Sequence, residues 1–173
     1  MNNRPKIRAA KYTIYCLFML ALYILQTTPG FLSIGGLKPN FVIPVAMAIA
    51  VCEGDFPGGI FGAVAGILCD FSATSLFGFQ AAILLACCTA AGLLTVYLLR
   101  PTIVNFILLL AAALLIHGML IYLLNFYMWG YEDVILVLTR RILPSIIYTL
   151  LLSPLPFLAV HRLHERFEEW LEE

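Results

Sequence analysis

The sequence has little charge for its length. Charged side chains make up 12% of its 173 residues, whereas hydrophobic side chains make up 62%. A soluble domain averages about 25% charged and roughly 45–50% apolar residues, and one of this size could not bury so much apolar surface. The sequence has no basic patch of the kind that binds nucleic acid. Lipid must therefore be the solvent for much of the chain, which predicts an integral membrane protein.

Signals for enzyme chemistry are also missing. The chain has no G-x-S-x-G, no H-E-x-x-H, no phosphate-binding loop and no close pair of carboxylates within an apolar segment. The five cysteines lie in or beside apolar runs, without C-x-x-C or zinc-ligand spacing. We therefore predict no catalytic residue, no cofactor and no metal site, and we expect buried free thiols.

Six apolar segments follow one another, at residues 12–28, 41–52, 58–69, 81–99, 103–126 and 142–160. A spanning helix needs about 20 apolar residues, and the second and third segments each cover only about 18 Å of a ~30 Å hydrocarbon core. They form either two short helices or one re-entrant hairpin. We favour an all-α bundle of six transmembrane helices over residues 1–160, and either alternative leaves both termini on the same side.

Basic residues predict the orientation of this bundle. The positive-inside rule places both termini in the cytoplasm, although Arg140 and Arg141 then lie outside, beside Glu132 and Asp133. Residues 161–173 have apolar side chains at helical spacing, which predicts a cytoplasmic amphipathic tail or a solvated end of the last span. The bases assigned to the cytoplasm are Arg4, Lys6, Arg8, Lys11, Arg100, Arg162 and Arg166.

The third segment carries the strongest local pattern. Gly58, Gly62, Gly66 and Asp70 recur every four residues, so they form one stripe on a helix. Small residues let membrane helices approach closely, which predicts a seam for helix packing or for a partner. A groove for a small ligand is the alternative. Asp70 is either a functional carboxylate at membrane depth or a cap for the next segment.

Three more polar residues lie within the apolar segments. His117 is in the middle of the fifth segment, and no second ligand is evident, which favours a neutral, hydrogen-bonded core histidine over a proton relay or metal ligand. Gln26 and Asn105 lie near segment ends, where amides hydrogen-bond between helices. We predict intramembrane polar contacts at these three positions.

In these features the sequence resembles the MreD family, whose members are the integral membrane subunit of the bacterial cell-elongation machinery. The length, the six segments and the short loops fit this family. So do the glycine-rich third segment that ends in an aspartate and the prolines of the last segment. The residues that carry the resemblance are Leu25-Gln26, Lys38-Pro39-Asn40, the run from Gly58 to Cys69-Asp70, Gly78, Pro144 and Pro154.

The resemblance implies a non-enzymatic scaffold in the bacterial plasma membrane that binds MreC and helps to regulate cell shape and peptidoglycan synthesis. MreB, RodA and the transpeptidase partner of RodA would belong to the same complex, and copies of the chain could self-associate. The family is similar in fold to the substrate-binding subunits of energy-coupling-factor transporters. A vitamin-binding subunit is therefore the alternative function, although the apolar segments offer few polar groups to a ligand.

Overall fold

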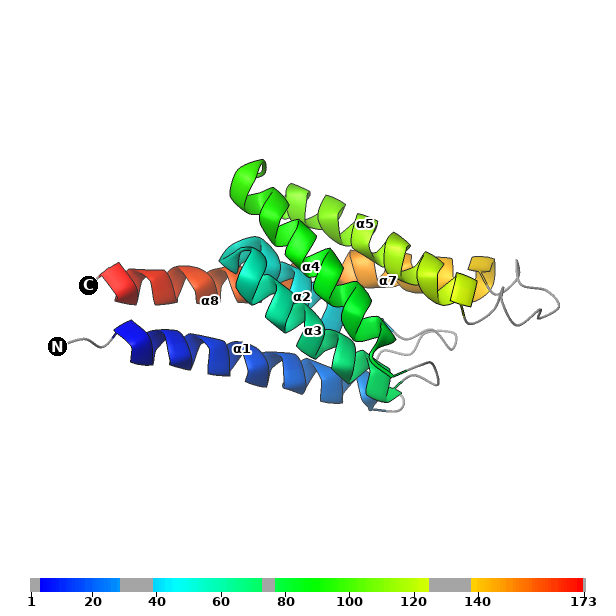
Figure 1. The fold of residues 1–173 in the computed structure, drawn as a ribbon, viewed down its shortest axis with the longest axis horizontal. Helices are drawn as coiled ribbons and strands as arrows, with labels where there is room; N and C mark the ends of the chain where they lie inside the picture. The colour runs from blue at the N-terminus through cyan, green and yellow to red at the C-terminus, as the bar shows by residue number, and fades with distance from the viewer. Residues whose placement is uncertain (1–3, 29–38, 73–76, 125–137, 173) are drawn as a thin grey trace.

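In the computed structural model, the chain is described over residues 4–28, 39–72, 77–124 and 138–172, and these ranges are almost entirely helical (Figure 1). No strand occurs in them, so the all-α prediction is confirmed. The elements are α1 (Arg4–Thr27), α2 (Val42–Glu53), α3 (Asp55–Ser72), α4 (Phe79–Tyr97), α5 (Ile103–Tyr122), a π-helical turn (Leu138–Ile142), α7 (Leu143–Leu152) and α8 (Pro154–Glu172).

Four helical stretches in the described ranges are long and apolar enough to cross a membrane. They are Lys6–Thr27, Phe79–Tyr97, Ile103–Tyr122 and Leu143–Glu169, and the last of these joins α7 and α8. By length and composition the chain is a multi-pass membrane protein. Six crossings, which also need α2 and α3, remain a prediction.

Helix α2 is the centre of the bundle. Every residue from Val42 to Val51 is buried, and the helix contacts α1, α3, α4, α5 and α8. A helix that is apolar around its whole circumference can be surrounded by protein or by lipid, and α2 is surrounded by protein. Because protein rather than lipid surrounds it, a helix of 12 residues does not have to match the thickness of a bilayer.

Most helix ends differ by a few residues from the predicted segments, and three of the differences matter for the site. Helix α1 begins at Arg4, so the basic residues before the first apolar segment are helical. Helix α3 continues to Ser72, which places Asp70 inside the helix. The sixth segment is divided at Ser153, because Pro154 has no N–H with which to continue α7, and α8 then runs unbroken to Glu172.

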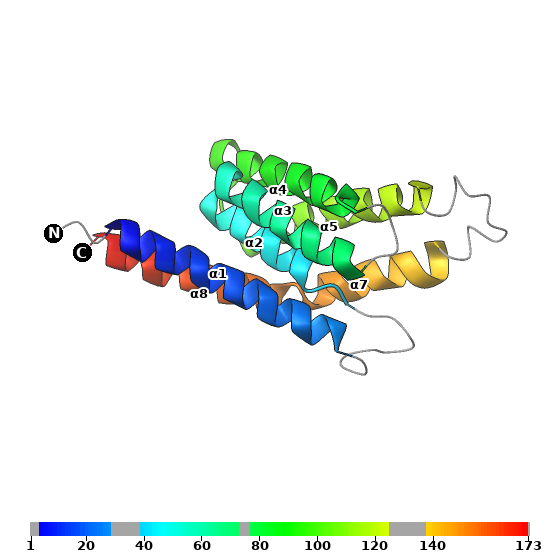
Figure 2. The same ribbon diagram turned by 60° about the horizontal axis from the view of Figure 1, so that its bottom comes forward.

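The first turns of α1 and the last turns of α8 lie side by side and extend beyond the turn between α2 and α3 (Figures 1 and 2). Lys11 of α1 donates a hydrogen bond to Oε1 of Glu168 in α8, at 2.9 Å. The two ends of the described chain therefore share one end of the bundle. Their location in the cytoplasm remains a prediction.

Candidate functional site

The glycine stripe of α3 faces the chain's own helices. A Cβ atom on Gly62 would lie 2.6 Å from the carbonyl oxygen of Leu84 in α4, and one on Gly58 would lie 2.6 Å from Cβ of Ala50 in α2. A Cβ on Gly66 would collide with the backbone of Ala81. The absence of side chains thus lets α3 approach α2 and α4 to backbone contact.

Asp70 extends this stripe and caps α4. Its carboxylate accepts hydrogen bonds from the backbone N–H groups of Gly78 at 2.9 Å, Gln80 at 3.1 Å and Ala81 at 3.3 Å. These amides begin the helix and have no acceptor within it. A negative charge is also favourable at a helix N-terminus. The contacts of Asp70 are therefore those of the capping role.

His117 and Gln80 form a buried pair between α5 and α4. Nε2 of His117 lies 3.2 Å from Oε1 of Gln80, and the two residues are 7% and 6% exposed. No group of three potential metal ligands occurs in the part of the chain that the structure describes. The contact matches a hydrogen-bonded core histidine.

Gln26 connects α1 to the start of α2. Its Oε1 accepts hydrogen bonds from the N–H groups of Phe41 at 2.8 Å and Val42 at 3.4 Å. Oδ1 of Asn40 also accepts from Val42, at 3.1 Å. The side chains of Gln26 and Asn40 therefore satisfy the first amides of the central helix.

Asn105 makes a local contact instead. Its Nδ2 donates to the carbonyl of Arg100 at 3.0 Å, within the connection from α4 to α5. This hydrogen bond therefore joins Asn105 to the connection before its own helix rather than to a distant helix.

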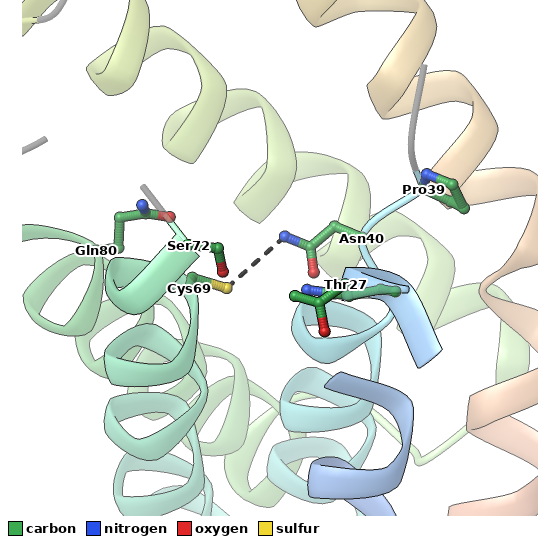
Figure 3. A pocket seen from close by; sticks show the side chains of 7 residues that line it. Thr27, Pro39, Asn40, Cys69, Ser72 and Gln80 are labelled. Carbon is green, nitrogen blue, oxygen red and sulfur yellow. Dashed lines mark hydrogen bonds between the residues drawn. The ribbon is translucent and has the colours of Figure 1, made fainter. Parts of the chain in front are cut away.

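A polar cavity of about 360 Å³ lies at the end of the bundle where α1 ends and α4 begins. Figure 3 shows its two walls, one from α3 and α4 and the other from the end of α1 and the approach to α2. Nδ2 of Asn40 and Sγ of Cys69 are 3.7 Å apart across it. Its lining residues are Gln26, Thr27, Pro39, Asn40, Cys69, Ser72 and Gln80.

The opposite end contains a cluster of ionisable side chains that the sequence analysis did not assemble. Nζ of Lys11 lies 2.6 Å from Oε1 of Glu53, and these side chains are 2% and 8% exposed. The Tyr15 hydroxyl donates to the same oxygen at 2.9 Å, and Nδ1 of His164 lies 2.7 Å from it. Glu168 completes the cluster through its 2.9 Å contact with Lys11.

This cluster joins three helices that are far apart in sequence. Lys11 and Tyr15 come from α1, Glu53 ends α2, and His164 lies in α8. A buried charge without a partner is strongly unfavourable, so the buried side chains of Lys11 and Glu53 depend on each other. The cluster therefore holds the two terminal helices against the central one.

Beside the cluster, a cysteine, a histidine and a glutamate lie in the order of a nucleophile, a base and an orienting carboxylate. Sγ of Cys52 lies 3.9 Å from Nδ1 of His161, whose Nε2 is 3.3 Å from the exposed carboxylate of Glu165. A working nucleophile and base lie about 2.6–3.2 Å apart. The longer separation gives no support to nucleophilic catalysis at Cys52.

Helix α4 presents small residues on the face that it does not use for α3. Ala82, Ala86 and Ala90 recur every four residues, and all three are exposed. Leu85 and Leu93 flank them and are 46% and 40% exposed. We refer to Ala82, Ala86 and Ala90 as the alanine stripe, which is a surface that another helix could approach closely.

Comparison with known proteins agrees with these features. A family model described as rod shape-determining protein MreD matches residues 6–166. No curated protein and no solved structure matches the chain. The likeness to energy-coupling-factor subunits thus remains a prediction. Since the family match covers nearly the whole chain, the protein belongs to the MreD family, whose role is in the determination of rod shape.

Proposed function

We propose that this protein is a non-enzymatic membrane scaffold of the cell-elongation complex, and that it binds the single transmembrane helix of MreC. The family match over residues 6–166 carries the proposal. Through this contact the protein would help to regulate cell shape and peptidoglycan synthesis. MreB, RodA and the transpeptidase partner of RodA would belong to the same assembly.

A scaffold needs a stable body, and the packing supports this requirement. Backbone contact along the glycine stripe joins α3 to α2 and α4. The Lys11–Glu53 pair joins α1 to α2 at the end where the termini lie. Both sets of contacts lie in the interior of the bundle, which leaves the outer faces of the helices for lipid or for a partner.

The alanine stripe of α4 is the docking face that we favour for MreC. Lipid tails are as apolar as leucine, so a helix gains little by hydrophobic burial and associates in a membrane through close packing. Exposed Ala82, Ala86 and Ala90 permit that packing. Leu85 and Leu93, in the neighbouring row on one side of the stripe, would add van der Waals contact with the partner helix.

We also propose six crossings with both termini in the cytoplasm. The shared position of α1 and α8 at one end of the bundle fits an even number of crossings. The amphipathic tail at residues 161–173, of which residues 161–172 lie in α8, would then present its exposed charges to cytoplasmic partners. Arg162, Glu165 and Arg166 are among them.

The test is to replace Ala86 by tryptophan and to measure co-purification of MreC from solubilised membranes. The indole would prevent close approach at α4, whereas the bundle should still fold because Ala86 is exposed. Ala112→Trp is the matched control, since Ala112 is an exposed alanine on α5. We expect Ala86→Trp to lose MreC and Ala112→Trp to retain it.

Equal recovery of MreC with wild type and both variants would contradict docking at the alanine stripe. Loss of MreC with both variants would place the contact elsewhere or over a wider surface. Recovery of an ATPase pair and a coupling membrane subunit, without wall-synthesis proteins, would instead favour the transporter alternative.

A further inference from the structure

We propose that the polar cavity between α1, α2, α3 and α4 binds an uncharged, hydroxyl-rich group of the sugar type. The proposal is independent of MreC docking, because the cavity lies at the ends of these helices and not on the alanine stripe. Its volume of about 360 Å³ falls within the ~300–1,000 Å³ range of small-molecule sites.

The lining determines the charge of the ligand. None of the seven lining residues carries a formal charge. Asp70 follows the lining residue Cys69 in sequence, and its carboxylate, which accepts from the N–H of the lining residue Gln80, disfavours an anion nearby. Its oxygens are already occupied by the amides of Gly78, Gln80 and Ala81, so a cation would have to compete with them. A buried charge without a partner is costly, which leaves an uncharged polar ligand.

The lining also determines the hydrogen-bonding character of the ligand. Oε1 of Gln26 already accepts from Phe41, and Oε1 of Gln80 contacts His117. The amide nitrogens are then the groups left to donate, because neither Nε2 of Gln26 nor Nε2 of Gln80 hydrogen-bonds to another of the described residues.

Asn40 adds a third amide donor. Its Nδ2 reaches Sγ of Cys69 at 3.7 Å, and a thiol is a weak acceptor. The hydroxyls of Thr27 and Ser72 donate to carbonyls of their own helices, which leaves their oxygens to accept. A ligand that both accepts and donates, as sugar hydroxyls do, satisfies this set.

The cavity lies at the depth of lipid headgroups. Thr27 ends one candidate span, and Gln80 is the second residue of another. The Tyr23 hydroxyl is 3.4 Å from the hydroxyl of Ser72, and tyrosine gathers at the membrane–water interface. The sugar group could therefore belong to a glycolipid of the adjoining leaflet or to a free saccharide, because both present the same hydroxyls.

The experiment uses the full chain in phosphatidylglycerol nanodiscs. Binding of methyl glucoside, the free probe, is followed by saturation-transfer NMR. The lipid probe is monoglucosyl diacylglycerol, and its enrichment on protein taken from mixed vesicles is measured by mass spectrometry. Thr27→Trp fills the cavity. Thr13→Trp is the matched control, because both threonines are exposed on α1 and bond the carbonyl four residues earlier.

We expect at least one probe to bind wild type and Thr13→Trp equally, and Thr27→Trp about tenfold more weakly. Methyl glucoside binding would identify a free saccharide as a sufficient ligand, and enrichment of the glycolipid alone would identify the lipid headgroup. Failure of both probes on wild type, or equal binding by Thr27→Trp, would overturn the proposal. Displacement of the bound probe by inorganic phosphate would also overturn it, because the site would then favour an anion.

Discussion

Replacing Gly62 by alanine should destabilise the bundle, although alanine is the better helix former. The new Cβ would lie 2.6 Å from the carbonyl oxygen of Leu84 and 2.7 Å from Cβ of Cys88, whereas ordinary contact begins at 3.4 Å. The difference, 3.4 minus 2.6, is about 0.8 Å. Because a backbone atom sets this limit, rotation of a side chain cannot relieve it, and α3 must move away from α4.

The size of the effect follows from two opposing contributions. Overpacking a close contact costs about 1–3 kcal/mol. Replacing glycine by alanine within a helix returns up to ~1 kcal/mol. Taking the middle of the first range, about 2 kcal/mol, less a return of up to ~1 kcal/mol leaves a net loss in the free energy of unfolding of about 1–2 kcal/mol. That loss lowers the midpoint of thermal unfolding by roughly 2–8 °C for a chain of this size.

Gly118→Ala is the matched control. Its new Cβ would lie 3.2 Å from Cγ2 of Ile142 and 3.2 Å from Cδ1 of Ile146, which are the ends of side chains that can adjust. We expect this variant to be as stable as wild type or more stable. Both variants would be unfolded in one detergent and followed by circular dichroism. If Gly62→Ala matched Gly118→Ala, the backbone contact would not limit the packing of α3.

Two further changes test the two ends of the bundle by the same unfolding assay. Glu53→Ala should cost up to about 3–5 kcal/mol, because the buried Lys11 then keeps only its contact with the half-exposed Glu168. The double variant Lys11→Met with Glu53→Leu should recover most of that loss, because neither charge is then left buried. If the double variant unfolded as easily as Glu53→Ala, an unpaired buried charge would not be the cause of the loss. Asp70→Ala should cost about 1–2 kcal/mol, since the first amides of α4 lose their acceptor; an unchanged midpoint would show that other groups cap α4.

Helices that are long and apolar could be located from the sequence, although their ends were predicted less well. Helix α5 begins at Ile103, as the proline before it and the apolar run after it indicate. The central position of α2 could not be predicted. A short, uniformly apolar segment has no polar face to show its orientation, so enclosed and re-entrant helices look alike. The contacts of the other helices, rather than its own pattern, make α2 central.

The ionic cluster was missed for a related reason. Lys11 belongs to a run of terminal bases that the positive-inside rule already explains, and Glu53 looks like part of a polar turn. His164 is 111 residues away from Glu53 in sequence. The available signal was that Lys11 stands next to Tyr12 at the start of the apolar run, where an unpaired charge is costly. The role of Asp70 was easier to predict. Its position at the end of the glycine stripe left two roles, a functional carboxylate or a cap for the next helix.

The position of Glu53 has a consequence for how the chain is made. Synthesis produces Lys11 first and Glu53 soon afterwards, but His164 and Glu168 only near the end. Until α8 is inserted, the carboxylate at the end of α2 has only part of its final set of partners. The last helix therefore completes the bundle, and a chain that stops after α7 would present an exposed ionic cluster to membrane quality control.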